Sequence, residues 1–175
     1  DIIFEVDNKS LTNRPDLWSH YGIAREFSAI SGRPLKALDV DDLSKYNELP
    51  QVDMKIEDTL CQRYSCLQFE NISRNVSPVN MRIRLFYCGM RAINFLADMT
   101  NYLMLEVGQP MHAFDSRKVG KIRIKRFENP LTFTTLDNVE RNIDENTLMI
   151  CNDNTPVAIA GIMGGLDSEI VEDTT

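Results

Sequence analysis

Long apolar runs are missing from this 175-residue sequence, in which no uninterrupted apolar segment exceeds four residues. A membrane-spanning helix needs about 20 apolar residues, and the apolar core of a signal peptide needs roughly 7 to 15. We therefore expect a soluble protein with no membrane span.

Closely spaced cysteines are missing as well, and histidine is scarce. The four cysteines (Cys61, Cys66, Cys88 and Cys151) form no C-x-x-C pair, and the chain has two histidines. Zinc centres and redox-active thiols normally need such spacing. We expect no metal site, and we expect reduced thiols in a cytoplasmic protein.

The common catalytic signatures are absent too. The chain contains no phosphate-binding loop, no G-x-G-x-x-G, no G-x-S-x-G and no H-E-x-x-H. Nucleotide kinases, Rossmann oxidoreductases, serine hydrolases and zinc proteases therefore lose their usual sequence support.

The chain does have enough apolar material for one core. Apolar residues make up 43% of it, which excludes global disorder. The net charge of −7 argues against coating nucleic acid through bulk charge, while leaving room for local basic patches. The sequence starts at Asp1 within a predicted strand at residues 2–6 and without an initiator methionine. We expect it to be a piece of a longer chain.

Periodicity predicts two helices in the first half of the chain. Apolar residues at three- and four-residue spacing predict a helix that follows Asn13-Arg14-Pro15-Asp16 and ends near Gly32. Ser77-Pro78 predicts the start of a second helix, which runs to about Cys88. Because this helix has apolar residues on two faces, we expect it to be covered on both sides.

A third helix and a set of strands follow. The helix fits Phe95 to Val107, with Asn94 as its cap and Gly108 at its end. Alternation predicts strands at residues 64–70 and 122–125, and short apolar runs predict more at 131–136, 147–151 and 157–160. Tight turns are expected at residues 137–138 and 152–154.

This order of elements predicts an α+β fold, with a mainly antiparallel sheet and packed helices. Acidic residues and a proline predict a linker over residues 39–52. We expect an N-terminal strand and helix over 1–38, and one domain core over 53–175 that is truncated at its C-terminal end.

Polar residues interrupt the third predicted helix at Asp98, Thr100 and Asn101. At 100 degrees per residue, Asp98 and Asn101 share one edge, and Thr100 points away from both. We favour an interpretation in which Asp98 and Asn101 tie the helix to a neighbouring loop, over a catalytic role. Thr100 stays open between the two.

The two histidines have different settings. His112 leaves a loop fixed by Gly108 and Pro110, as site residues often do, but packing between Met111 and Phe114 is an equally good interpretation. His20 falls on the apolar side of the first predicted helix, and we interpret it as structural.

Two further segments carry possible chemistry. Residues 158–165 form a strand that runs into three glycines, which permits close approach of a backbone or ligand, or simply makes a turn or bulge. Six bases and no acid lie between Ser116 and Phe127. A phosphate backbone can dock there, although alternation also makes Arg123 and Lys125 the solvated face of a strand.

Three motifs in sequence order carry a family resemblance. They are Asn13-Arg14-Pro15-Asp16 with Gly22-Ile23-Ala24-Arg25-Glu26, then residues 98–102 and 106–115 (DMTNY and EVGQPMHAFD), then residues 158–165 (AIAGIMGG). Together they resemble the central editing domain of the phenylalanyl-tRNA synthetase beta subunit, of the B3/B4 type. The likeness spans nearly the whole chain.

The resemblance implies hydrolysis of tyrosine wrongly esterified to the phenylalanine tRNA. It also implies membership of a ligase that uses ATP and magnesium elsewhere, has no cofactor in this domain, and pairs with an alpha subunit in a heterotetramer. By the family pattern His112 and Thr100 are catalytic, and Asn101, Arg91, Ala160, Gly161 and Gly164 bind substrate. The basic stretch adds candidate tRNA contacts, namely Arg117, Lys118, Arg123 and Lys125.

The resemblance also implies a gap, because the glutamate that reads the tyrosine hydroxyl in such enzymes lies in a motif just past Thr175. An isolated piece is then expected to show weak activity or none. Two rival hypotheses are a non-catalytic module that binds tRNA or scaffolds the synthetase, and a free-standing deacylase.

Overall fold

The computed structural model describes residues 2–73 and 75–175. The chain divides into two compact units, each built from two stretches of sequence. We call Asp1–Asn47 with Arg74–His112 the helical unit, and Glu48–Ser73 with Ala113–Thr175 the sheet unit. The described residues confirm an α+β fold.

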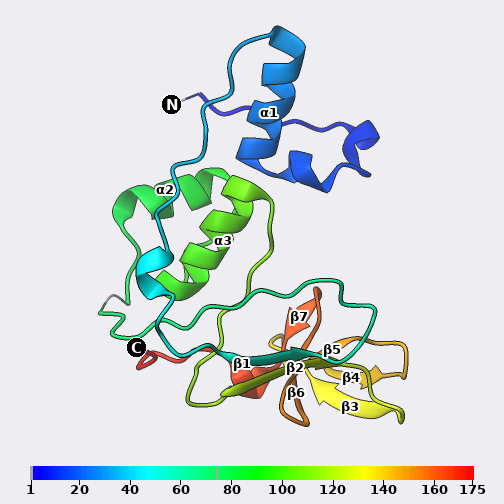
Figure 1. The fold of residues 1–175 in the computed structure, drawn as a ribbon. Coiled ribbons are helices and arrows are strands. Elements are labelled where there is room, and N and C mark those ends of the chain that lie inside the picture. The colour runs from blue at the N-terminus through cyan, green and yellow to red at the C-terminus, as the bar shows by residue number, and fades with distance from the viewer. Residues whose placement is uncertain (1, 74) are drawn as a thin grey trace. The chain divides into compact units, whose positions relative to one another are not determined.

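Among its described residues the helical unit has three α-helices (Figure 1), which are α1 (His20–Ser31), α2 (Val79–Tyr87) and α3 (Phe95–Val107). Both α1 and α2 pack against α3. Short 3-10 helices lie at Lys9–Leu11, Pro15–Trp18 and Ser44–Tyr46. Residues 2–7 belong to no helix or strand, so the strand expected at residues 2–6 is not formed.

The ends of α1 follow from its sequence. The Ser19 hydroxyl accepts a hydrogen bond from the Gly22 N–H, which satisfies one of the unpaired donors of the first turn. Gly22 lies so close to the preceding turn that an added Cβ would be 1.6 Å from the Asp16 carbonyl oxygen. The helix ends at Gly32, whose φ of 70° is left-handed, as predicted.

The bounds of α3 are those predicted. The Asn94 side chain accepts a hydrogen bond from the Ala97 N–H at 2.9 Å. At the other end Gly108 is left-handed and donates its N–H to the Met104 carbonyl. Both ends are therefore capped by the side chain or backbone that the sequence indicated.

Helix α2 differs from its prediction in two ways. The N-cap residue of α2 is Pro78 and not Ser77. The Ser77 hydroxyl donates to the Asp98 carboxylate instead. The helix is also covered on one side only: Leu85 is fully buried, whereas Phe86 is 74% exposed. The expectation of two covered faces was wrong, because α2 packs on α3 through a single face.

The sheet unit contains a five-stranded sheet in the order β1-β2-β5-β6-β7 (Figure 1). These strands are β1 (Asp53–Ile56), β2 (Lys121–Lys125), β5 (Met149–Asn152), β6 (Thr155–Ile159) and β7 (Met163–Gly164). Only β1 and β2 pair in parallel among the described strands, so the sheet is mainly antiparallel, as expected.

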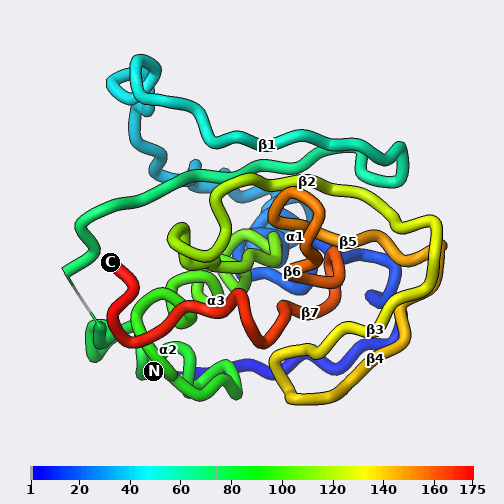
Figure 2. The backbone as a smooth tube through the Cα atoms, turned by 90° about the horizontal axis from the view of Figure 1, so that it is seen from below, coloured from blue at the N-terminus to red at the C-terminus, as the bar shows by residue number. Residues whose placement is uncertain are grey.

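A separate hairpin is formed by β3 (Leu131–Thr134) and β4 (Glu140–Ile143), which run side by side in Figure 2. Asn138 turns this hairpin with a φ of 59°, and Asp153 turns β5 into β6 with a φ of 56°. Asparagine and aspartate tolerate this left-handed backbone, which confirms both predicted turns.

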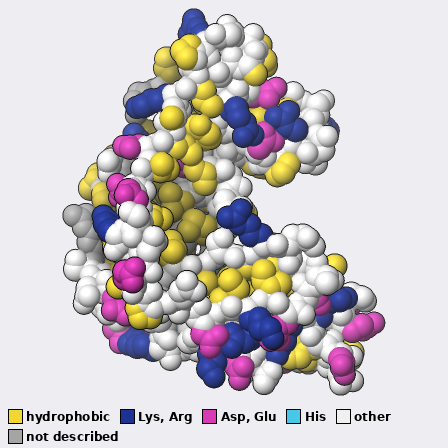
Figure 3. All heavy atoms as spheres, in the orientation of Figure 1, with side chains coloured by type: hydrophobic (Ala, Val, Ile, Leu, Met, Phe, Trp, Pro, Cys, Tyr) yellow, Lys and Arg dark blue, Asp and Glu magenta, His cyan; other side chains and the backbone are white. Residues whose placement is uncertain are grey.

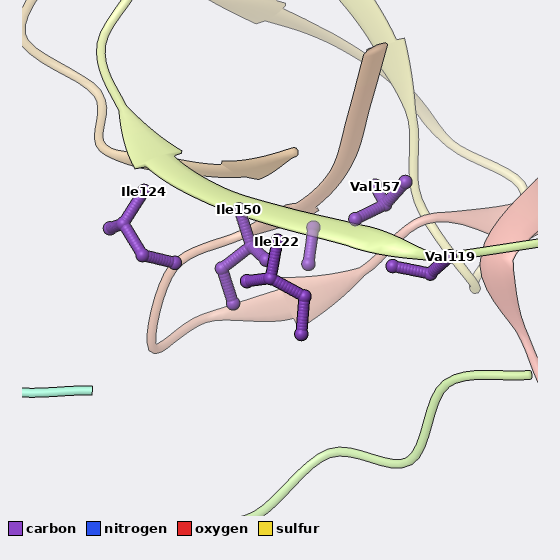
Figure 4. Close-up of a cluster of buried hydrophobic side chains, with 6 residues drawn as sticks. Val119, Ile122, Ile124, Ile150 and Val157 are labelled. Atoms are coloured by element: carbon purple, nitrogen blue, oxygen red, sulfur yellow. The ribbon is translucent and has the colours of Figure 1, made fainter. Parts of the chain in front are cut away.

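The core of the sheet unit lies on two faces. One cluster combines Val119 with side chains of β2, β5 and β6 (Figure 4), namely Ile122, Ile124, Ile150, Val157 and Ala158. The other contains Phe133, Ile143, Met149, Cys151 and Ile159. Because β5 lies between the two clusters, three successive residues of it are buried.

The strand expected at residues 64–70 is not present, since this segment belongs to no strand. Its alternation is nevertheless real, because Tyr64 and Cys66 pack against the first cluster. The ladder partner of β2 is instead β1, which the sequence pattern did not indicate.

Candidate functional site

The predicted site residues fall in both units. Arg91, Thr100, Asn101 and His112 belong to the helical unit, and the residues of the glycine motif belong to the sheet unit. The hypothesis that they line one pocket stays a prediction.

In α3 the three polar side chains have different partners. Asp98 is 1% exposed and accepts hydrogen bonds from the Ser77 hydroxyl at 2.5 Å and the Ile93 N–H at 2.7 Å. This carboxylate therefore ties α3 to the segment before α2 and to the loop between the helices, as the structural interpretation proposed.

Thr100 and Asn101 keep hydrogen-bonding capacity. The Thr100 hydroxyl donates to the Ala97 carbonyl at 2.8 Å, which leaves its oxygen able to accept. The half-buried Asn101 side chain makes no hydrogen bond with the described residues, so it does not share the tying role of Asp98. Both can receive a polar group of a substrate.

His112 lies in the loop that leaves α3. Its side chain is exposed, yet surrounding protein atoms desolvate the ring enough to lower the pKa of His112. A lowered pKa favours the neutral imidazole near pH 7, because desolvation penalises the charged form. A neutral imidazole is the form that accepts a proton from water.

The loop that carries His112 is fixed at both ends. At its start Gly108 lies against Ser19, where an added Cβ would be 3.2 Å from the serine Cβ and Oγ. At its end Asp115 is 1% exposed and accepts hydrogen bonds from the Arg117 N–H at 2.9 Å, the Arg117 guanidinium and the Thr174 hydroxyl. Arg117 holds the pKa of Asp115 well below its usual range.

Sequence reasoning missed this function of Asp115. In the sequence Asp115 is only the last residue of a motif, and Arg117 is a candidate tRNA contact. The signal was present as the spacing Asp-x-Arg, in which the arginine side chain folds back onto the carboxylate two residues earlier. Arg117 also pairs with Asp173 at 2.9 Å, which joins the C-terminal segment to the same network.

His20 has a structural part. Its Nδ1–H donates to the Leu105 carbonyl at 2.9 Å and so links α1 to α3. This hydrogen bond supports the structural interpretation of His20.

The glycine motif follows β6 and includes β7. Ala160 packs against the first core cluster, and Gly161 turns the chain with a φ of 71° and open space around its Cα. The Gly161 N–H bonds no described residue, so it can donate to a ligand. Gly164 is buried in β7 opposite Ala158.

Within the glycine motif, Gly165 is the residue that other atoms of the sheet unit approach closely. An added Cβ there would be 2.5 Å from the Phe133 ring and 2.8 Å from the Val157 carbonyl oxygen. The third glycine therefore serves packing within the sheet unit.

The three arginines of the basic stretch are paired with acids. Arg123 binds Asp53 at 2.8 Å, and Arg126 binds Asp58 at 2.6 Å. Figure 3 shows Lys and Arg side chains interspersed with Asp and Glu over the sheet unit. The interpretation of Arg123 as part of a solvated face was wrong: its side chain is 16% exposed, because parallel pairing of β1 with β2 brings Asp53 beside it.

Two lysines of the stretch are also engaged. Lys118 donates to the Glu169 carbonyl at 3.0 Å, and Lys125 donates to the Asn154 side chain at 2.5 Å. Contact of Arg117, Lys118, Arg123 and Lys125 with tRNA stays a prediction, and each of these side chains already has a partner within the sheet unit.

The described residues contain neither a metal-ligand cluster nor a membrane-spanning helix. No group of three His, Cys, Asp or Glu side chains within them is arranged to hold a metal ion. Among the described helices, none combines the length and apolar character that crossing a bilayer requires.

The described residues form an α+β domain that combines a helical unit with a mixed sheet. It carries a histidine in a loop and a glycine turn, and its sequence lacks the motifs of the common enzyme classes. A family model described as "B3/4 domain" matches residues 60–175, and the chain belongs to the B3/4 domain family.

Relatives of this chain include phenylalanine–tRNA ligase beta subunits. That of Clostridium acetobutylicum is 43% identical over 173 residues, which cover 97% of this chain and 22% of the relative. The beta subunit of Solibacter usitatus is 41% identical over 182 residues, which cover 100% of this chain and 23% of the relative. The chain thus spans about a fifth of the length of these relatives, and the resemblance seen in its motifs is confirmed.

Proposed function

We propose that this chain is the editing part of a phenylalanine–tRNA ligase and hydrolyses the ester of tyrosine on phenylalanine tRNA. The observation that carries the proposal is His112: within a B3/4 domain, a loop fixed at both ends presents an imidazole whose lowered pKa favours its neutral form. The likeness to phenylalanine–tRNA ligase beta subunits supplies the substrate class.

The chemistry is a proton-coupled attack of water on the ester carbonyl. The water oxygen forms the new bond to carbon, and His112 or a free hydroxyl of the terminal ribose orients this water. The neutral imidazole of His112 takes up the water proton and later returns it to the leaving ribose oxygen. The carbonyl electrons move onto oxygen, and we assign to the Gly161 N–H, which bonds no described residue, the role of donor to that oxyanion. The ester C–O bond then breaks, and the ribose oxygen leaves with a proton.

Thr100, Asn101, Arg91, Ala160 and Gly164 complete the proposed site. The oxygen of Thr100 and the amide of Asn101 are available for hydrogen bonds to the aminoacyl group. A pocket shaped for phenylalanine rejects one added hydroxyl only weakly, whereas a second site that hydrogen-bonds this hydroxyl can discriminate by roughly 10⁴ or more. Editing therefore reverses the order of preference.

The wider enzyme is part of the same proposal. We assign the chain to a cytoplasmic ligase that attaches phenylalanine to its tRNA, contains an alpha subunit in a heterotetramer, and uses ATP and magnesium at a separate site. The names of the relatives support ligase membership.

The test is tyrosine release from tyrosyl-tRNA(Phe) by the intact ligase that carries His112→Ala. Loss of a positioned base is expected to slow release by about 10²–10⁴-fold while the circular dichroism spectrum is unchanged. His20→Gln is the control, because His20 bonds the Leu105 carbonyl and has no proposed part in the chemistry. Equal rates for His112→Ala and the parent enzyme remove His112 from the reaction.

The second candidate is a non-catalytic module that binds tRNA or scaffolds the ligase. The observation in its favour is the Thr100 hydroxyl, which already donates to the Ala97 carbonyl. This candidate predicts that the ligase binds tyrosyl-tRNA(Phe) but releases tyrosine no faster than buffer does.

A further inference from the structure

A hollow of about 450 Å³ lies at the C-terminal end of α2, within the helical unit. It is lined by Arg82, Phe86, Gly89, Met90, Arg91 and Ala92. Arg91 entered the account through family resemblance, whereas nothing in the sequence singled out Arg82 or Phe86.

Local sequence explains how these side chains meet. Arg82 and Phe86 are four residues apart on α2, so they lie on the same face of the helix. Beyond the helix, Gly89 is left-handed with a φ of 76°, and the Met90 N–H donates back to the Leu85 carbonyl at 2.9 Å. This reversal returns the following segment, with Arg91, to the side of Phe86.

The two guanidinium groups of this hollow lack partners among the described residues. Neither Arg82 nor Arg91 makes an ion pair or a side-chain hydrogen bond there. Arg84, two residues along the same helix, donates to the Tyr102 hydroxyl at 2.5 Å. In a chain of net charge −7, two uncompensated cations around one hollow favour an anionic ligand.

Phe86 narrows the class of anion. Its side chain is 74% exposed, at the edge of the hollow. An exposed aromatic ring beside arginines is the arrangement that binds single-stranded nucleic acid, because the ring stacks on a base and the guanidinium contacts the adjoining phosphate. An acidic peptide needs the cations but has no base to stack on the ring.

We propose that this hollow binds the single-stranded end of an RNA, with one phosphate between Arg82 and Arg91 and one base stacked on Phe86. The inference rests on the proposed function, which supplies an RNA substrate that ends in an unpaired strand. It adds Arg82 and Phe86 to the residues that hold this substrate.

The test titrates the chain with a fluorescently labelled single-stranded RNA of about six nucleotides that ends in cytidine-cytidine-adenosine, at several salt concentrations. Arg82→Gln is expected to weaken binding and to reduce the slope of log K against log salt by about 0.7, the contribution of one phosphate on a single strand. Phe86→Ala is expected to weaken binding roughly 5- to 150-fold with the slope unchanged, whereas Phe86→Tyr keeps the stacking surface and the affinity.

Arg84→Gln is the matched control, since it removes the same charge from the same helix at a side chain that is already bonded. The proposal is overturned if the parent chain does not bind the RNA, if Arg82→Gln and Arg84→Gln behave alike, or if Phe86→Ala binds as tightly as the parent. It is also overturned if an acidic peptide binds the parent and Phe86→Ala with the same affinity and displaces the RNA from the parent.

Tyrosine release by the intact ligase separates this inference from the proposed function. If the RNA binds through Arg82 and Phe86 but the tyrosyl ester is not hydrolysed, RNA binding by the hollow is supported and the editing proposal is contradicted. If the ester is hydrolysed but Arg82→Gln and Phe86→Ala bind RNA like the parent, the editing proposal is supported and RNA binding by the hollow is contradicted.

Discussion

At the scale of single residues, Asp115 determines where the chain runs after His112. It is nearly inaccessible to solvent and is surrounded by donors from Arg117 and Thr174. A buried carboxylate is stable in its charged form only when such donors replace its water. The side chain thus fixes one end of the histidine loop and holds the C-terminal segment.

Replacement of this carboxylate gives the first prediction. We expect Asp115→Asn to lower the free energy of unfolding by about 1.5–3 kcal/mol at pH 7, because it removes a charged acceptor from buried donors. Asp173→Asn is the control: it removes a second, 75% exposed partner of the same arginine and is expected to have a much smaller effect. Equal losses in urea unfolding would contradict the network as described.

The pH dependence of the same pair follows from the sign of the shift. The pKa of Asp115 is lowered in the folded state, whereas the unfolded value is about 3.9. Its stabilising contribution is therefore complete above about pH 4 and is lost as pH falls toward the folded pKa. The difference between the parent and Asp115→Asn is expected to shrink below pH 4.

At the scale of elements, α3 is stabilised by its own cap. We expect Asn94→Ala to lower the free energy of unfolding by about 0.5–2 kcal/mol, since the Ala97 N–H loses its acceptor. Asn94→Asp keeps an acceptor of similar quality and is expected to match the parent within a few tenths of a kcal/mol. Equal unfolding free energies of Asn94→Ala and Asn94→Asp in urea would contradict the capping bond.

The glycine that directly follows β7 gives a second prediction at the scale of elements. Gly165→Ala is expected to cost about 1–3 kcal/mol of unfolding free energy, because the new Cβ overlaps the Phe133 ring and the Val157 carbonyl. Gly120→Ala is the matched glycine of the same unit, with nothing within 4 Å of the new Cβ. Its unfolding free energy is expected to stay within about 0.5 kcal/mol of the parent.

Local signals predicted those elements whose ends are encoded locally. Asn94 and Gly108 defined α3, and Asn138 and Asp153 marked the hairpin turns. Strand β1 escaped prediction because its pairing with β2 joins residues nearly 70 positions apart, and no local pattern encodes such a contact. Residues 64–70 show the converse, since alternation reports burial of one face and not the presence of a ladder.

For the candidate site, the sequence predicted the residue types better than their partners. The motifs named His112 and Thr100, but the Asp115 network depends on Thr174 and Asp173, which are remote in sequence. The acidic partners of the three arginines in the basic stretch could not be predicted for a similar reason, since these acids lie on β1, on the segment after it and near the C-terminus.

At the scale of the whole molecule, both units are discontinuous in sequence. The sheet unit takes residues 48–73 from before the second and third helices, so the chain enters it twice. The proposed editing residues come from both units, and the chain enters the sheet unit for the second time between His112 and Ala113. The first boundary between the units, between Asn47 and Glu48, falls within residues 39–52, and the linker there stays a prediction.

The central claim is that a ligase containing this chain removes tyrosine from phenylalanine tRNA. The most direct measurement compares the release of tyrosine from tyrosyl-tRNA(Phe) with the release of phenylalanine from phenylalanyl-tRNA(Phe) by that ligase, without ATP. The account predicts faster release of tyrosine by roughly 10²-fold or more. Release of both amino acids at the same rate would contradict it.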